Sequence, residues 1–454
     1  MRNPMFVYDE KLTDLIFDYC RWRLSLDPVP LDYGGAVEES LAARLEGLMT
    51  EGGVDPAVVM ELFDTTLATA VVSCDSPKFL AFIPAAPTKA ALLFDMVVAC
   101  SSLHGTSWIE AAGPVAAENQ ALRVLADLAG LPAGAGGCFV AGGSAGNLSG
   151  LMVGRDTAAY RMGDLVPERP VVAISEEAHS SVGKALHVLG VEPLLVPVDD
   201  HRLTGRSLRA ALATHPRGDD VIAVVATGGT TNAGIVDDLE GVADVAEERK
   251  LWFHVDGAYG AAALFAPSAR HRFRGIERVD SFVVDPHKWL FAPFDCAALL
   301  YREPRLAKAV HSQDASYLEV FHTDAPEEWN PSDYAFHLTR RARGMPLWFS
   351  LAVNGTDAYR DAVETVLAVT QEVADLIEAT PHLELVRRPE LSVVLFRRRG
   401  WGKADYEAWS ARLLAEQIGF VVHTTWEGEP VGRLALLHPD TDLGLVADIL
   451  ATAA

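Results

Sequence analysis

The chain has 454 residues, half of them hydrophobic and 22% charged, so it is long enough for more than one domain and too apolar to be disordered. Lys and Arg number 38 against 62 Asp and Glu, and the net charge of −24 disfavours nucleic acid and anionic membranes as partners. No apolar run reaches the ~20 residues of a membrane-spanning helix, and the first residues lack the pattern of a signal or transit peptide.

The five cysteines are odd in number and far apart, with no C-x-x-C pair. This spacing is typical of reduced thiols in a cytoplasmic protein. It argues against a disulfide framework or a zinc site, so we expect no metal.

Residues 1–75 have a helical pattern, with Pro and Gly interruptions at 28–35 and 52–56. Residues 76–350 alternate between short β-rich apolar runs and helical patterns, which predicts a large α/β domain with a mostly parallel sheet covered by helices. The seven apolar runs are Cys138–Ala141, Val171–Ile174, Pro193–Val198, Val221–Thr227, Trp252–Val255, Ser281–Val284 and Cys296–Tyr301; helical patterns between them include Gly183–Leu189, Ser207–Thr214 and Leu239–Arg249.

Residues 351–454 have a different organisation. A long helical pattern near Ala352–Ala379 leads into short apolar runs around an amphipathic helix at Ala404–Gln417. The runs are Leu383–Arg387, Ser392–Arg397, Phe420–His423 and Arg433–His438. This pattern predicts a small C-terminal α+β domain with an antiparallel sheet.

Ligands of parallel α/β sheets bind beyond the carboxyl ends of the strands, and the first such end here is the glycine-rich AGGSAGNL at 141–148. We expect a helix to begin near Gly146. Glycines permit close approach of a ligand, and free amides at a helix start attract anions, so a phosphate is expected against Gly143, Ser144 and Ala145. The alternative, a tight turn with a serine cap, is equally consistent with this segment alone.

Two further strand ends carry His179 and Asp256. His179 could stack on a flat ring, although a histidine before a helix is more often a cap or surface residue. Asp256 ends an apolar strand, where a carboxylate requires a cation or donor such as a protonated pyridine nitrogen. The alternative role for Asp256 is that of a helix N-cap. Ala258 is small enough for a ring to lie against it.

The fourth strand end, DPHKW at 285–289, carries Lys288 between His287 and Trp289. A lysine in apolar surroundings suits Schiff-base chemistry, whereas most lysines are exposed or paired with an acid. Pyridoxal 5'-phosphate (PLP) presents a phosphate, a ring face, a pyridine nitrogen and an aldehyde. The chain therefore offers one matching group for each, which favours a PLP site over four unrelated features.

These segments resemble the PLP-dependent group II decarboxylases, the family of aromatic-L-amino-acid and glutamate decarboxylases. The similar stretches lie between about Pro77 and Trp348 and include AGGSAGNL, EEAHSSVGKA, ATGGTTNAGIVDDL, WFHVDGAYG, VDSFVVDPHKWLFAPFDCA and DYAFHLTRRARGMPLW. The resemblance implies the α/β fold type I of PLP-dependent transferases, which is aspartate aminotransferase-like. It also implies a homodimer with shared active sites, around which the N-terminal helices wrap.

The resemblance also implies residue roles. Lys288 would form the Schiff base, Asp256 would pair with the pyridine nitrogen, and His179 and Ala258 would lie on the two ring faces. The phosphate would be surrounded by Ser144, Ala145, Thr230, His287 and Asp285. Asp285 stands where many animal members have Asn, which adds a negative charge beside the phosphate.

Tyr334 matches the family's proton donor to Cα, on a lid that we expect over Ser312–Asp333, although a packing role is the alternative. It favours decarboxylation over the aldehyde-synthase branch, which carries Phe there.

The resemblance places Phe82, Ile83, Pro84 and Trp108 beside the substrate side chain, which favours an aromatic amino acid; plain core packing is equally consistent. Ala85 and His104 depart from the aromatic pattern. A glutamate or diaminobutyrate decarboxylase, an aldehyde synthase and an inactive PLP-binding paralogue remain the alternatives.

Overall fold

The computed structural model describes residues 3–31, 38–83, 86–163, 166–313 and 328–454. A seven-stranded sheet with the order β1-β7-β6-β5-β4-β2-β3 organises the middle of the chain, and only β7 runs antiparallel to its neighbours. Its strands are β1 (Gly136–Val140), β2 (Val171–Ser175), β3 (Glu192–Val196), β4 (Val221–Thr227), β5 (Trp252–Asp256), β6 (Ser281–Val284) and β7 (Ala297–Tyr301). The expected fold type I architecture is therefore confirmed.

Helices cover both faces of this sheet, as the continuous apolar strands require. All residues of β4, β6 and β7 are buried. One face packs on α5 (Trp108–Leu128), α9 (Gly205–Thr214), α10 (Leu239–Arg249) and α14 (Met345–Ala379). The other packs on α6 (Gly143–Asp156), α8 (Ser180–Leu189) and α13 (Pro304–His311). Shorter helices are α7 (Ala158–Met162), α11 (Pro267–Arg270) and α12 (Pro286–Trp289).

Helix α6 packs unusually close to the sheet because glycines repeat every four residues on one face. A methyl group on Gly146 would lie 2.6 Å from Val283 Cγ2, and one on Gly154 would lie 2.8 Å from the Trp252 ring. At Gly150 it would lie 3.1 Å from the His254 ring. These contacts explain why glycines, which weaken isolated helices, are present in α6.

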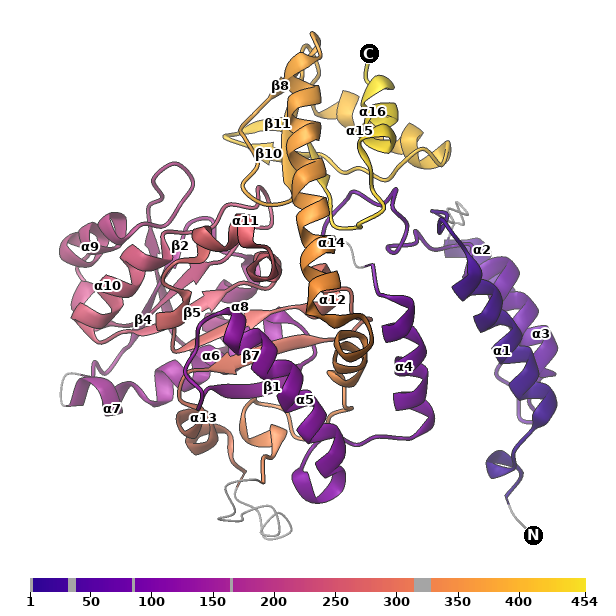
Figure 1. The fold of residues 1–454 in the computed structure, drawn as a ribbon, viewed down its shortest axis with the longest axis horizontal. Coiled ribbons are helices and arrows are strands. Elements are labelled where there is room, and N and C mark those ends of the chain that lie inside the picture. The colour runs from indigo at the N-terminus through magenta and orange to yellow at the C-terminus, as the bar shows by residue number, and fades with distance from the viewer. Residues whose placement is uncertain (1–2, 32–37, 84–85, 164–165, 314–327) are drawn as a thin grey trace.

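A four-stranded antiparallel sheet with the order β10-β11-β9-β8 forms the end of the chain, beside α15 (Lys403–Ala415) and α16 (Leu443–Ala451) (Figure 1). The strands are β8 (Leu383–Leu385), β9 (Val393–Arg398), β10 (Thr424–Trp426) and β11 (Glu429–Ala435). The strand predicted at Phe420–His423 is wrong. Phe420 makes an isolated bridge to Phe79 and exchanges backbone bonds with Lys78 and Leu80 instead, so the strand begins at Thr424.

The N-terminal helices lie apart from the rest of the chain (Figure 1). They are α1 (Glu10–Ser25), α2 (Glu38–Leu45) and α3 (Pro56–Leu62), followed by α4 (Lys89–Cys100). Neither α1 nor α3 contains a buried residue, and Ile16, Phe17 and Trp22 of α1 are 37–50% exposed. Within the described part of the chain, no helix combines the length and apolarity that crossing a membrane requires.

A buried ion pair joins α5 to the segment before α14. Arg340 donates two hydrogen bonds of 2.7 Å to Glu118, and the two side chains are 0% and 3% exposed. Glu118 also accepts from the Gly344 amide, and Arg340 donates to the Gly105 carbonyl. The pair therefore holds several loops together.

Replacing Arg340 by Met is expected to lower the free energy of unfolding by about 3–5 kcal/mol, because the Glu118 carboxylate would remain buried without its cation. Urea unfolding of the purified protein measures this change. Arg341→Met is the control, since Arg341 pairs with Asp95 near the surface and its loss should cost less than about 1 kcal/mol. Equal losses in both variants would contradict the assignment.

Candidate active site

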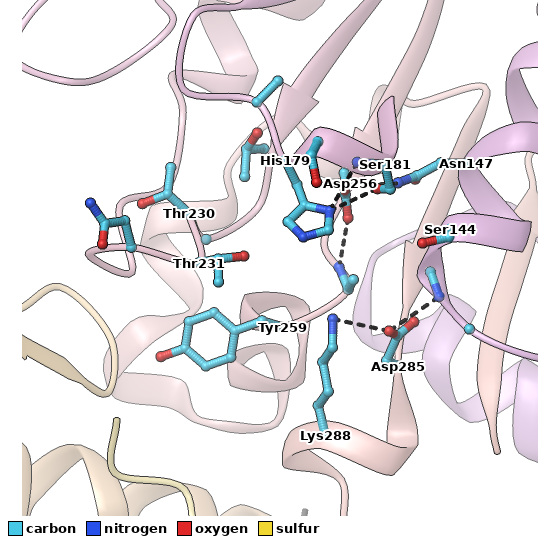
Figure 2. Close-up of a pocket in the computed structure, with 18 of the residues that line it drawn as sticks. Ser144, Asn147, His179, Ser181, Thr230, Thr231, Asp256, Tyr259, Asp285 and Lys288 are labelled. Carbon is cyan, nitrogen blue, oxygen red and sulfur yellow. Dashed lines mark hydrogen bonds and ion pairs between the residues drawn. The ribbon is translucent and has the colours of Figure 1, made fainter. Parts of the chain in front are cut away.

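A cavity of about 580 Å³ opens at the carboxyl ends of the central strands. The loops after β1, β2, β4, β5 and β6 all reach it, as expected for a parallel α/β sheet. Figure 2 shows their side chains pointing toward a common space. The residues that line it are Ala141, Gly142, Gly143, Ser144, Asn147, Glu177, Ala178, His179, Ser180, Ser181, Thr227, Gly229, Thr230, Thr231, Asn232, Asp256, Ala258, Tyr259, Asp285, His287, Lys288 and Phe294.

The start of α6 forms one wall of the cavity. The helix begins at Gly143, three residues earlier than expected, and its N-cap residue Gly142 has no side chain, so the Gly143 amide donates to Asp285 instead. A Cβ on Gly143 would lie 2.9 Å from Ala258 Cβ and 3.1 Å from both Asp285 carboxylate oxygens, so only glycine fits. The amides of Gly143, Ala145 and Gly146 already donate within the protein, so the Ser144 amide and hydroxyl are the groups of this helix start that can hold an anion such as a phosphate. Ala145 does not line the cavity, and its amide bonds the Gly142 carbonyl.

Lys288 projects from α12 into the cavity beside Asp285 (Figure 2). Its Nζ lies 3.1 Å from Asp285 Oδ2, which also accepts the Gly143 amide at 3.1 Å. Asp285 Oδ1 is buried without a hydrogen-bond partner. His287 Nδ1 accepts from the Cys296 amide at 3.0 Å, and burial lowers the pKa of His287.

Asp256 lies at the end of β5, only 5% exposed. Its Oδ1 accepts from the Ala258 amide at 3.2 Å and its Oδ2 accepts from Asn147 Nδ2 at 2.8 Å. These two donors fix the carboxylate while it still lines the cavity. Such a carboxylate can bind a protonated ring nitrogen.

His179 and Thr230 lie at other walls of the cavity. His179 precedes α8, and its Nδ1 contacts the Ser181 amide at 3.2 Å and the Ser181 hydroxyl at 2.8 Å. Thr230 Oγ1 accepts from the Ile235 amide. The imidazole is thus held at its Nδ1 edge, and Figure 2 shows the ring facing the space above Lys288.

The structure brings together all the expected cofactor residues except Ala145. The donor set fits PLP: the α6 start for the phosphate, Asp256 for the ring nitrogen, Lys288 for the aldehyde and His179 for a ring face. The close approach at Gly143, where a methyl group would not fit, supports this match. The charge of Asp285 does not fit this match, because its carboxylate lies beside the start of α6, where the phosphate would bind.

The expected substrate residues and Tyr334 do not line this cavity. Phe82 is 60% exposed. Trp108 is the first residue of α5, and its backbone amide donates a hydrogen bond to Asn330 Oδ1. Ile83 packs against the core, and Pro84 lies outside the described residues.

Tyr334 is 5% exposed and stacks on Trp329 with ring centroids 4.1 Å apart. Burial raises the pKa of its hydroxyl, and the ring lies away from the cavity of its own chain, so this position does not support proton donation within the same chain. The donor role remains a prediction. Of the expected lid at Ser312–Asp333, residues 314–327 lie outside the described residues.

Sequence reasoning missed several polar residues of the cavity: Asn147, Ser181, Thr227, Thr231, Asn232 and Tyr259. Asn147 carried a usable signal, because it follows the glycine-rich turn by less than one helical turn and a helix starting at Gly143 points it toward Asp256. The others follow strand ends but have no distinctive spacing.

Comparison with known proteins gives consistent similarities. Residues 51–399 match the pyridoxal-dependent decarboxylase conserved domain. An aromatic-L-amino-acid decarboxylase of Bacillus atrophaeus is 31% identical over 85% of this chain and 79% of its own length. An L-2,4-diaminobutyrate decarboxylase of Rhizobium meliloti (strain 1021) is 32% identical over 82% and 76%. The crystal structure of Oryza sativa TDC with PLP and tryptamine superposes with a TM-score of 0.91 and 25% identity, covering 100% of this chain and 98% of that one.

Proposed function

The chain belongs to the family of pyridoxal-dependent decarboxylases and is a PLP-dependent carboxy-lyase, and from this premise we propose that it decarboxylates an aromatic L-amino acid to the amine, with Lys288 binding the cofactor covalently. The observation that carries the residue assignment is the single cavity lined by Lys288, Asp256, His179 and the start of α6.

The proposed roles follow from the contacts of each group. When bound, PLP supplies an electron-accepting ring for the electron pair that the departing CO2 leaves behind. The Ser144 amide and hydroxyl, together with Thr230 and His287, would hold the phosphate. Asp256 holds a proton on the ring nitrogen, and His179 covers one ring face while Ala258 leaves room on the other.

Lys288 and Asp285 act as a pair. The Lys288 amine binds the cofactor aldehyde, and once released it becomes an ammonium that Asp285 can hold at the observed 3.1 Å. Asp285 therefore keeps the displaced lysine, and one transferable proton, inside the cavity. This role accounts for a carboxylate close to an anion site.

The relatives favour an aromatic substrate. The Bacillus atrophaeus relative is an aromatic-L-amino-acid decarboxylase, and the Oryza sativa TDC crystallised with tryptamine. The test is incubation of the PLP-loaded protein with L-Trp, L-Tyr, L-Phe, L-Dopa, L-glutamate and L-2,4-diaminobutyrate, with CO2, amine, aldehyde and peroxide measured. Amine from an aromatic substrate supports the proposal; equal CO2 and peroxide would assign an aldehyde synthase.

Diaminobutyrate is the second candidate. A diaminobutyrate decarboxylase is as similar as the aromatic relatives, and the Glu177 carboxylate lines the cavity, where it could bind a distal ammonium. Glu177 also lies 3.0 Å from His201 Nδ1. Faster CO2 release from diaminobutyrate than from any aromatic amino acid would select this candidate.

We further propose a cytoplasmic homodimer in which residues 1–75 contact the partner, next to a large domain at 76–350 and a small one at 351–454. The exposed apolar side chains of α1 support the contact, because such a surface is stable when covered. Phe82, Trp108 and Tyr334 lie outside the cavity of their own chain, which fits a contribution to the partner's site.

The double substitution Ile16→Asp and Phe17→Asp is expected to convert the dimer to monomers, because it places charges on the apolar face of α1. Light scattering after size-exclusion chromatography measures the mass. Decarboxylation should fall at least about tenfold if the sites are shared. Lys11→Ala on the same helix is the control that should remain dimeric, and a monomeric wild-type protein would contradict the proposal.

A further inference from the structure

A chain of buried hydrogen bonds runs through the sheet to the cavity. Trp252 Nε1 donates to Ser281 Oγ at 2.9 Å, and Ser281 Oγ lies 2.7 Å from His254 Nδ1. His254 Nε2 lies 2.9 Å from Asn147 Oδ1. Trp252, Ser281, His254 and Asn147 are each 0–1% exposed, so water cannot replace these partners.

The direction of the bonds in this chain is set by the Asp256 carboxylate, which can only accept. The Asn147 amide nitrogen therefore faces Asp256, and Asn147 Oδ1 faces His254 Nε2 as an acceptor. His254 Nδ1 then accepts the hydroxyl hydrogen of Ser281, whose Oγ accepts from Trp252 Nε1. The hydrogen of the imidazole is then on Nε2, where it is donated to Asn147 Oδ1. Burial lowers the pKa of His254 to about 4, so the ring carries only this one ring hydrogen at neutral pH.

Asn147 divides the chain into two branches. With Oδ1 occupied as an acceptor, its amide nitrogen directs one hydrogen to Asp256 Oδ2 at 2.8 Å and the other to Ser181 Oγ at 3.1 Å. Ser181 in turn donates to His179 Nδ1 at 2.8 Å, so the hydrogen of His179 is on Nε2. Asn147 therefore contacts Asp256 directly and His179 through Ser181, in addition to the backbone amides of Ala258 and Ser181 that donate to the same two groups.

We propose that His254 is a positioning residue, which holds Asn147 as a donor to Asp256 and thereby keeps Asp256 an acceptor for a protonated ring nitrogen. This inference rests on the proposed role of Asp256. Without His254, Asn147 can rotate its amide and turn Oδ1 toward Asp256. When Asn147 Oδ1 faces an Asp256 carboxylate oxygen, a proton between the two oxygens is favoured, and Asp256 then holds that proton in place of the cofactor ring nitrogen.

The test compares His254→Leu with His254→Gln, whose amide can still donate to Asn147. In His254→Leu, kcat is expected to fall about 10- to 100-fold with little change in KM, the scale seen when outer hydrogen-bond partners of a functional group are removed. The pH midpoint of the cofactor absorbance should rise by about one unit. A ring nitrogen that is less protonated repels the proton on the nitrogen joining Lys288 to the cofactor less strongly, so that proton is lost at a higher pH. His254→Gln should recover most of both losses.

His311→Leu is the matched control, because His311 is also buried, also has its pKa lowered to about 4 by burial, and contacts the Ser149 carbonyl of α6 instead of Asn147. Unfolding temperatures of the apo-proteins show whether a variant loses activity because it is less stable or because the site residues are no longer held in position. If His254→Leu does not fold, Ser281→Ala removes the hydroxyl that orients His254 at its Nδ1, with less change in volume, and should shift the pH midpoint in the same direction.

The outcomes distinguish failure of the proposed function from failure of the positioning role. Wild-type protein that binds no PLP would overturn the proposed function. Wild-type and His311→Leu proteins with normal absorbance, together with His254→Leu and Ser281→Ala proteins whose pH midpoint and kcat are unchanged, would overturn the positioning role alone.

Discussion

Lys288→Ala protein is expected to show no visible absorbance from covalently bound cofactor and a kcat at least about 10⁴-fold lower, the scale of loss when a central catalytic group is removed. Lys288 is the lysine that lines the cavity, and its Nζ is 3.1 Å from Asp285. Without the amine, the cofactor aldehyde has no covalent attachment. Absorbance spectra of the reconstituted protein and an assay of amine release measure both effects.

Two further variants separate covalent from ionic roles. Lys288→Arg keeps a cation for Asp285 but does not attach the cofactor, so it should fold like the wild type and remain inactive. Lys308→Ala should be normal, because Lys308 lies outside the cavity. Wild-type absorbance and amine release in Lys288→Ala would contradict the assignment.

Asp256→Ala is expected to retain part of the cofactor affinity and to lose turnover about 10³-fold or more, since the α6 start and Lys288 still bind PLP while the ring nitrogen loses its anionic partner. Cofactor titration of the apo-protein and single-turnover CO2 release measure the two quantities separately. Asp280→Asn is a control, because Asp280 is a partly buried carboxylate that pairs with Arg161 outside the cavity. Normal amine release by Asp256→Ala would exclude the proposed electronic role.

The strands and the loops of the site were predictable from the sequence, because buried parallel strands are continuous apolar runs and each ends at an unusual polar residue. Asp256 and Lys288 illustrate this: both directly follow such runs. The start of α6 was predicted three residues late, since glycines are poor helix formers and only the packing on Val283 and His254 makes them favourable.

Other features depended on contacts between distant segments. Phe420 pairs with the segment around Phe79 rather than with the small sheet, which no local pattern indicates. Tyr334 has the polar neighbours of a loop residue, yet it stacks on Trp329 in the interior. His254 and Ser281 alternate with apolar residues in buried strands, so their bonds to Asn147 were not detectable without the fold.

The glycine face of α6 has a consequence for altering this enzyme's substrate range. Because no methyl group fits between α6 and the sheet, the helix cannot slide or tilt without separating from Val283, Trp252 and His254, and its anion-binding end and Asn147 move with it as one rigid body. Libraries that vary the sheet-facing glycines of α6 should therefore yield inactive proteins whichever amino acid is offered. Productive variation is expected instead among residues that α6 does not touch, such as Phe82 and Trp108, under the proposal that they contribute to the partner's site.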